Sequence, residues 1–479
     1  MIVGELRHGQ LAIIDRIKET VRLSEGLDDH GSLTEGARRR ALDCLSRFGQ
    51  RLQDMHASSV RTAGTSALRR ASDSYAFRKD AERALGHPID VISGTEEARL
   101  IYKGVAQSLP PHDGLRLVLD IGGGSTELIL GQGERPSALE SLHMGCVQVT
   151  EKYFPQGRID RASFDAARLA ARLKLRPVKA FFRDAANLEA IGTSGTIIST
   201  ESVARETGII ESNDLTSAVV EKLITRVLEF GNIAELSLAG LSERRSQVWP
   251  GGLAILVELL EVLRVDKLKV SDGALREGLL YDYIGRLQHD DARERSVDAL
   301  ARRFNVDQAQ AERVAKSAAD LLQQSALDWQ LVHPLAKGIV EWSARLHEIG
   351  LDISHDGFHR HGAYIVANAD LPGFPRSEQA VLAFVIAGQM GPLNSKNIQS
   401  MPSVWRTSAL RISVIHRLAV LLNRSRSTRE LPAIGFAVSG ESIELTFPAG
   451  WLTENPLTVA DLSREKKALA DAGFELTFS

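Results

Sequence analysis

In the first part of the chain, segments whose apolar residues recur at helical spacing alternate with short apolar runs that end in glycine or hydroxyl residues. One set lies three or four residues apart and predicts the buried face of a helix: Ala37, Ala41, Leu45, Phe48, Leu52 and Met55. Residues 60–65 and 89–93 predict strands, and a second helix is expected to start after residues 94–97. This alternation of strands and helices predicts an α/β domain.

The most informative pattern lies between two further strands. Residues 115–119 predict a buried strand and residues 128–130 the strand returning beside it. The chain between them reads Asp120-Ile121-Gly122-Gly123-Gly124-Ser125-Thr126-Glu127. Glycines let the backbone turn tightly and approach a ligand, and their N–H groups can converge on an anion. The two acids can hold a divalent cation, so we predict a phosphate loop with a metal beside it. A plain hairpin turn with solvated acids is the alternative.

Two later segments repeat this design. Residues 190–196 and 269–276 each predict a strand that runs into a turn of small and hydroxyl residues and then into a helix. The N-terminus of a helix presents free N–H groups and the positive end of its dipole, so these turns are expected to share one anionic ligand. Two common glycine loops are excluded. The chain has no G-x-x-x-x-G-K-[ST], and Glu127 stands where G-x-G-x-x-G needs its last glycine.

Composition narrows the class of protein. A chain of 479 residues predicts roughly two to four domains. Cys44 and Cys146 cannot build a disulfide framework, which indicates a reducing cytoplasm. A net charge of -3 argues against a uniformly basic nucleic-acid surface and leaves room for a local basic groove. Neither a secretory signal nor a membrane span is predicted, because Glu258 and Glu261 interrupt the most apolar stretch, residues 253–263.

The pattern changes after about residue 288. Residues 289–294 are highly charged and suit a linker or the exposed start of a helix. Helical patterns follow without a convincing strand until residues 434–438 and 443–447, which predict a small β element. An arginine cluster lies between these parts and predicts either a polyanion contact or a solvated helix end: Arg424, Arg426 and Arg429.

Together these loops resemble the exopolyphosphatase and guanosine pentaphosphate phosphohydrolase family, which shares the actin-like ATPase fold. The stretches that carry the resemblance are residues 64–69, 92–99, 120–127, 144–146, 192–196 and 271–278. The helical part resembles the long, four-domain form of the family. The resemblance implies an α/β fold class with two actin-like (ribonuclease H-like) domains at 1–100 and 101–287. An all-α HD-like domain at 288–430 and a small α+β domain at 431–479 follow, and a cytoplasmic homodimer is expected.

The resemblance also implies a reaction. It predicts release of terminal phosphate from inorganic polyphosphate as the first hypothesis and hydrolysis of guanosine pentaphosphate as the second. It assigns Glu97 as the general base for water, Arg69 to grip phosphate, and Asp120 and Glu127 to support Mg²⁺. The residues alone leave open which of Glu96 and Glu97 is the base, and an exposed first helical turn is the alternative for that pair. The expected phosphate-binding residues are Thr65, Ser66, Gly122, Gly123, Gly124, Ser125, Thr126, Gly192, Thr193, Ser194, Gly195, Ser271, Asp272 and Gly273.

The chain departs from the family pattern in two places. The family's first strand and first phosphate loop are expected before Met1, so the first domain is predicted to be truncated and an inactive polyphosphate- or alarmone-binding relative is a further hypothesis. In the helical part, His347-Glu348 stands where an HD-type metal phosphohydrolase has His-Asp, and more histidines follow in residues 355–361. This pattern predicts a non-catalytic HD-like domain. A sugar kinase or chaperone-like ATPase of the same fold ranks last, and neither nucleic acid nor a membrane is an expected partner.

Overall fold

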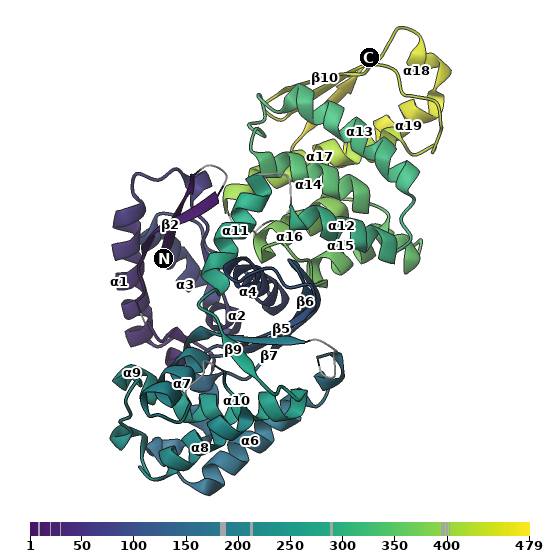
Figure 1. Cartoon of the computed structure of the whole chain (residues 1–479). Helices are drawn as coiled ribbons and strands as arrows, with labels where there is room; N and C mark the ends of the chain where they lie inside the picture. Colours follow the sequence, from purple (N-terminus) through teal and green to yellow (C-terminus); the bar gives the residue numbers. More distant parts are fainter. Residues whose placement is uncertain are drawn as a thin grey trace. The chain divides into compact units, whose positions relative to one another are not determined.

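The chain folds into two compact units, Met1–Asp290 and Asp291–Ser479, in a computed structural model (Figure 1). The structure describes all residues except 8, 9, 20, 29, 183–187, 211–213, 288–290, 394–397, 399, 400 and 402. His289 and Asp290 of the charged stretch at the boundary therefore lie outside the described residues, and Asp291 caps helix α12. Across the described residues, no helix combines the length and the hydrophobicity that a bilayer crossing requires.

A five-stranded sheet of order β7-β6-β5-β8-β9 forms the centre of the first unit. Its strands are β5 (Leu115–Ile121), β6 (Thr126–Gln132), β7 (Arg135–Leu142), β8 (Glu189–Thr193) and β9 (Leu268–Val270). Strands β5, β6 and β7 pair antiparallel, whereas β5, β8 and β9 pair parallel. The strand and returning strand predicted on either side of the glycine turn are present as β5 and β6. The sequence analysis missed β7, because this half-exposed strand has no apolar run.

Helices cover both faces of this sheet. Leu117 and Leu119 of β5 pack into a large apolar cluster with helix α10 (Trp249–Leu263), whereas Val118 packs on the opposite face against helix α4 (Gly94–Ser108). Figure 1 shows α4 on one side of the sheet and α6 (Arg161–Leu175), α8 (Ser217–Leu228) and α10 on the other. A strand buried on both faces is apolar at nearly every position, which is why β5 was recognisable from its sequence.

The first hundred residues contain less strand than predicted. The runs at 60–65 and 89–93 contribute only β3 (Ala63–Gly64) and β4 (Asp90–Val91), which pair parallel with each other. A strand extends only as far as its partner, so local propensity overestimated both lengths. Helix α1 (Glu35–Leu52) confirms the predicted amphipathic helix, but Met55 lies beyond its end and is exposed, so its inclusion was wrong. The rest of this region contains β1 (Ile2–Arg7), β2 (Gln10–Arg16), α2 (Ser66–Arg70) and α3 (Ser74–Leu85).

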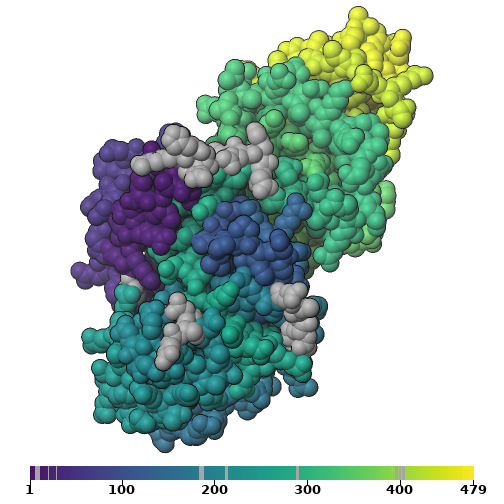
Figure 2. Space-filling view, viewed as in Figure 1, coloured from purple at the N-terminus to yellow at the C-terminus, as the bar shows by residue number. Residues whose placement is uncertain are grey.

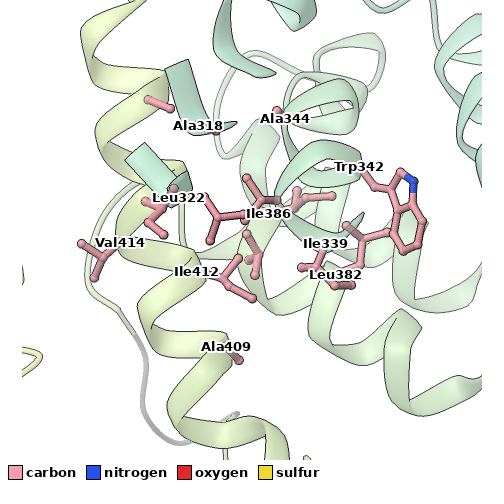
Figure 3. Packing of buried hydrophobic residues seen from close by; sticks show 14 of the residues in the cluster. Ala318, Leu322, Ile339, Trp342, Ala344, Leu382, Ile386, Ala409, Ile412 and Val414 are labelled. Atoms are coloured by element: carbon pink, nitrogen blue, oxygen red, sulfur yellow. The ribbon is translucent and has the colours of Figure 1, made fainter. Parts of the chain in front are cut away.

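The second unit is mainly helical and shares one core with a small sheet. Its main helices are α12 (Ala292–Arg303), α13 (Gln308–Ser325), α14 (Pro334–Leu346), α15 (Phe358–Asn368), α16 (Arg376–Ala387), α17 (Ser403–Leu422) and α19 (Pro456–Ala470). Figure 3 shows Ile339, Leu382 and Ile412 meeting in its core. The sheet joins the two predicted strands, β10 (Gly435–Ser439) and β11 (Ser442–Thr446), to β12 (Glu475–Phe478), which the sequence analysis missed.

Candidate active site

The glycine turn and the two later turns meet at one edge of the central sheet. Strands β5, β8 and β9 run parallel, so their carboxyl ends open on the same side. A pocket of about 500 Å³ lies there. Its lining includes turn residues from all three strands: Gly122, Gly123, Thr193, Ser194, Gly195 and Asp272. The sheet topology thus brings together segments that are about 150 residues apart in the sequence.

The glycine turn leaves no room for side chains on its inner side. The N–H groups of Cys146 and Val147, at the start of helix α5 (Cys146–Tyr153), donate to the carbonyl oxygens of Gly122 and Gly123 at 2.9 and 3.0 Å. A Cβ at Gly145 would overlap the backbone of Gly123. These contacts hold the turn against the start of α5, so its shape does not depend on a ligand.

The two acids of the turn face each other across the hairpin. Asp120 and Glu127 are direct partners in the β5–β6 register, which places both carboxylates on one face of the sheet. Ser194 Oγ donates to Asp120 Oδ2 at 2.6 Å, and Ser141 Oγ donates to Glu127 Oε1 at 2.8 Å. Burial raises the pKa of Asp120 to about 7, with the Ser194 hydrogen bond opposing the rise and Glu97 adding to it. Burial also raises the pKa of Glu127 well above its ordinary value, and Glu97 and Asp120 add to this rise.

Glu97 lies close enough to Asp120 and Glu127 to raise the pKa of both, and it is paired with one arginine. Arg69 Nη1 donates to Glu97 Oε2 at 2.9 Å and to the carbonyl oxygen of Ile92 at 2.9 Å. Burial raises the pKa of Glu97, while Arg69 and a hydrogen bond to Thr65 oppose the rise. Arg69 Nη2 is buried and finds no hydrogen-bond partner among the described residues. Arg69 therefore pairs with one of the three buried carboxylates, Glu97, and keeps one donor that an anion could use.

The structure separates the two neighbouring glutamates that the sequence could not distinguish. Glu96 is 3% exposed and accepts two hydrogen bonds from Arg99, at 2.7 and 2.8 Å, on the side of α4 that faces helix α11 (Leu275–Leu287). Arg99 also contacts Asp282 of α11 at 2.6 Å. Glu96 is thereby fully engaged in an ion pair, whereas Glu97 lies with Asp120 and Glu127.

Comparisons with known proteins identify the family of this chain. Residues 2–287 match the Ppx/GppA phosphatase family, and residues 292–466 match domain III of the same family. The chain belongs to the Ppx/GppA phosphatase family. It is 37% identical over 482 residues to a guanosine-5′-triphosphate,3′-diphosphate pyrophosphatase of Vibrio parahaemolyticus, over 100% of this chain and 95% of that protein. Because the chain belongs to this family, it is a hydrolase of the phosphatase class.

Solved structures of the family, which have an actin-like fold, match about three fifths of this chain. The Aquifex aeolicus family member is 25% identical with a TM-score of 0.50, over 60% of this chain and 94% of that structure. A Cytophaga hutchinsonii protein described as an exopolyphosphatase is 24% identical with a TM-score of 0.53, over 59% and 93% of the two chains. The actin-like family resemblance predicted from the loops is thus confirmed.

Several residues expected to bind phosphate in this Ppx/GppA chain also hold the loops in place. Thr126 Oγ1 donates to Met144 O at 2.6 Å, and Thr193 Oγ1 donates to Gly273 O at 2.7 Å. Gly273 N donates to Ser271 Oγ at 3.1 Å. These contacts leave the hydroxyls of Thr126 and Thr193 committed to the backbone, and they join the turns after β8 and β9.

Gly192 and Ser66 were also expected to bind phosphate, and each has its own kind of contact. A Cβ at Gly192 would lie 2.6 Å from Ile197 Cγ2, so this glycine serves close packing between β8 and helix α7 (Ser194–Glu206). Ser66 Oγ is buried and has no partner within the described chain, and it lies 2.8 Å from the position that a Cβ at Gly124 would take. The Ser66 hydroxyl therefore remains available beside the glycine turn.

The sequence analysis missed the basic side of the pocket. Its lining includes five cationic residues from three separate segments: Lys18, Arg22, Arg244, Arg245 and Arg276. The Arg245 guanidinium lies directly over Gly195, at the N-terminus of α7, where a Cβ would overlap it. A cation at the positive end of a helix dipole is unfavourable unless an anion lies between them. In the sequence, Arg244-Arg245 is indistinguishable from a solvated pair, so no local signal identified it.

The His347–Glu348 pair of the second unit has no metal-like arrangement. His347 Nδ1 lies 2.7 Å from Ala344 O, and burial lowers the pKa of His347 to about 4. Glu348 is paired with Arg426, which also contacts Asp307 at 2.9 Å. Arg424 pairs with Asp461 at 3.2 Å, so the predicted arginine cluster is divided between separate acids. Over the part of the chain that the structure describes, no group of three or more His, Cys, Asp or Glu side chains has the geometry of a metal cluster.

The raised pKa of Asp120 leads to a prediction about stability. Its pKa is 3.8 in the unfolded chain and about 7 in the folded one, so the folded chain retains a proton that the unfolded chain releases. This contribution to stability is complete below the unfolded value and is lost as pH rises through about 7. In chelating buffer, we expect the melting temperature of the first unit to fall between about pH 5 and about pH 8.

Asp120→Asn cannot ionise and should make this pH dependence shallower. The measurement is calorimetric unfolding of both proteins across the pH range, with Glu258→Gln as a control for loss of a buried carboxylate elsewhere in the unit. Glu258 is 1% exposed and pairs with Arg168 and Arg172. An equal pH dependence in wild type and Asp120→Asn would show that Asp120 is ionised in the folded chain.

Proposed function

We propose that the first unit hydrolyses the terminal phosphoanhydride bond of guanosine 5′-triphosphate 3′-diphosphate. The observation that carries this proposal is the buried Glu97 carboxylate, which is paired with Arg69 and lies beside Asp120 and Glu127 at the phosphate-sized glycine turn. Phosphoryl transfer needs positioning, charge neutralisation and an oriented nucleophile more than covalent catalysis. These residues supply all three.

In the proposed reaction, the terminal phosphate is bound by free N–H groups at the glycine turn and at the start of α7, and by Arg69 Nη2. Glu97 accepts a proton from a water molecule whose oxygen attacks the terminal phosphorus. The bond from that phosphorus to the bridging oxygen breaks, and its electron pair stays on that oxygen, which becomes the terminal oxygen of the remaining 5′-diphosphate. Orthophosphate leaves, and Glu97 returns its proton to solvent. Burial supports this role, because it raises the pKa of Glu97 and makes it a stronger base.

We also propose that Asp120 and Glu127 support Mg²⁺. Three ionised carboxylates beside the single guanidinium of Arg69 would leave two negative charges uncompensated in a buried place. The donors are all oxygen atoms, and Mg²⁺ commonly binds through one or two carboxylates with water and substrate phosphate completing its shell. The residues present therefore fit this ion. When bound, it would neutralise charge on the transferred phosphate.

The choice of substrate rests on the relatives and on the pocket. The sequence alone ranked polyphosphate first, but several relatives at 36–37% identity, over almost the whole chain, are named guanosine-5′-triphosphate,3′-diphosphate pyrophosphatases. The pocket supports this order, because Leu23, Phe48 and Val248 give it apolar walls beside its arginines. Apolar walls suit a nucleoside, which inorganic polyphosphate lacks. Polyphosphate remains the second candidate, favoured by the basic lining residues.

Glu97→Gln tests the assignment of the base. The amide keeps the shape of the side chain but cannot accept the proton, so we expect turnover to fall by about two to four orders of magnitude. Substrate binding should persist, because the glycine turn and Arg69 are unchanged. Phosphate release and equilibrium binding of guanosine 5′-triphosphate 3′-diphosphate are measured side by side, with Glu258→Gln as the control for a lost buried carboxylate.

The same assay on the wild-type chain compares guanosine 5′-triphosphate 3′-diphosphate, GTP and long-chain polyphosphate. The highest kcat/KM is expected for the first. If polyphosphate instead gave the higher kcat/KM, polyphosphate would become the proposed substrate, and the proposed mechanism would be unchanged. Near-normal turnover of Glu97→Gln on every substrate would remove Glu97 as the base.

Asp120→Asn tests the proposed metal support. Loss of one carboxylate should raise the Mg²⁺ concentration for half-maximal rate, because the ion then has one charged ligand fewer. Initial rates are measured over a Mg²⁺ series at saturating substrate, again beside Glu258→Gln. Superimposable Mg²⁺ titrations for wild type and Asp120→Asn would argue against Asp120 as a ligand.

For the second unit, we propose a helical, HD-like domain without catalytic chemistry of its own. This proposal is supported by Arg426, whose guanidinium pairs with Glu348, the acid that follows the buried histidine of the HD-type pattern. The Arg426 side chain thus supplies the positive charge that a metal would bring to this place.

His347→Gln tests this proposal. We expect phosphate release to stay within about twofold of wild type, with only a lower melting temperature from the buried substitution. Metal content and thermal unfolding of the purified variant are measured in parallel. Loss of a metal-dependent activity in a folded His347→Gln protein would show instead that the unit has catalytic chemistry.

A further inference from the structure

Helix α4 carries Glu97 in its first turn, which is buried, and the helix packs on strands β6 and β7 as well as on helix α11. Ser93 Oγ accepts a hydrogen bond from Glu96 N at 3.0 Å, and the preceding strand β4 is only two residues long. The place of the Glu97 carboxylate therefore depends on what holds the rest of α4. Its long contact with helix α11 supplies part of that support, and Figure 1 shows the two helices side by side.

The two helices meet through glycines. A Cβ at Gly104 of α4 would overlap the carbonyl oxygen of Ala274, just before α11. A Cβ at Gly278 of α11 would overlap the carbonyl oxygen of Leu100. Backbone packs directly on backbone at this crossing, so no side chain can adjust to let one helix slide past the other. The distance between the helices is fixed.

A buried charge network fixes the rotation of α4 about its own axis. Arg99 bonds Glu96 through two nitrogen atoms and reaches Asp282 of α11 at 2.6 Å. Asp282 in turn pairs with Arg286 at 3.0 Å. The side chains of Glu96, Arg99 and Asp282 are at most 7% exposed. Burial works against ionisation of Asp282, but the charges of Arg99 and Arg286 outweigh it and keep its pKa below the ordinary range.

This rotation decides where Glu97 lies. Successive residues of a helix are offset by about 100°, so a helix that holds Glu96 against α11 turns Glu97 to another side. On that side are Arg69 and the two acids of the glycine turn. A small rotation of α4 would move the Glu97 carboxylate out of reach of Arg69.

We propose that Arg99 and Asp282 are positioning residues that act on the reaction through Glu97, by locking α4 against α11. This inference rests on the proposed function of Glu97 as the base. The glycine turn belongs to the β5–β6 hairpin, whereas the lock joins α4 to α11. Arg99 and Asp282 themselves do not contact the reacting atoms.

Asp282→Asn and Glu258→Gln form a matched pair for the test. Each removes one buried carboxylate that two arginines hold within the first unit, and only Asp282 belongs to the α4–α11 lock. We expect Asp282→Asn to lower kcat by about 10- to 100-fold with little change in KM, because a small misplacement of a catalytic group has effects of this size. Glu258→Gln should retain kcat. Melting temperatures show whether both variants are folded.

A second comparison isolates the route through Glu97. If Asp282 acts only by placing Glu97, then adding Asp282→Asn to Glu97→Gln should leave the remaining turnover unchanged, because the effects of a coupled pair do not add. Gly104→Ala should mimic Asp282→Asn. Gly36→Ala is its control, because the nearest atom to the new methyl is the Arg40 Nη1 at 3.6 Å.

The outcomes separate this inference from the proposed function. Equal kcat in Asp282→Asn and Glu258→Gln, or fully additive effects in the double variant, would overturn the positioning role while Glu97 stays the base. Normal turnover in Glu97→Gln would instead overturn the proposed function.

Discussion

Concentration of negative charge in a buried place is the constraint on which the first unit depends. Asp120 and Glu127 are cross-strand partners, and Glu97 reaches the same place from helix α4. Like charges opposite each other destabilise a sheet, and burial adds a desolvation cost. The glycine turn, the hydroxyls of Ser141 and Ser194, and the guanidinium of Arg69 all offset parts of this cost. The negative charge that they leave uncompensated makes this site favourable for cations and protons.

A second buried network on helix α4 differs from this site, because its negative charges are matched by positive ones. Glu96 and Asp282 face Arg99 and Arg286, so two acids meet two arginines. The charges of this network are paired within the protein, and its buried partners cannot rearrange without losing hydrogen bonds. Two adjacent glutamates therefore serve different purposes. One belongs to a closed structural network, and the other to a site that remains electrostatically unsatisfied.

Local sequence patterns predicted the parts of the site that local structure creates. The β5–β6 hairpin with Asp120 and Glu127 was predictable, because an apolar strand, a glycine turn and a returning strand are contiguous. The separate roles of Glu96 and Glu97 were not, because they depend on Asp282, which is distant in the sequence. Arg245 was missed for the same reason, since only the folded chain places it over Gly195.

The second unit shows the same limit. A histidine followed by an acid suggested a degenerate metal site, but only the structure pairs Glu348 with Arg426. The short strand β12 was invisible because its parallel partner β11 lies about 30 residues earlier. The homodimer and the domain boundaries within each unit stay predictions, because a single chain and its pattern do not test them.

The start and the middle of helix α11 have different surroundings, and this has a consequence for how a substrate is recognised. Its first residues, Leu275 and Arg276, line the pocket, while its middle packs against α4 without intervening side chains. Force on the pocket wall is therefore transmitted to the helix that carries Glu97. In the proposed reaction, we expect parts of a substrate far from the scissile bond to contribute to turnover through this pair of helices as well as to affinity. A molecule that offers only phosphate groups, and leaves the wall untouched, forgoes that contribution.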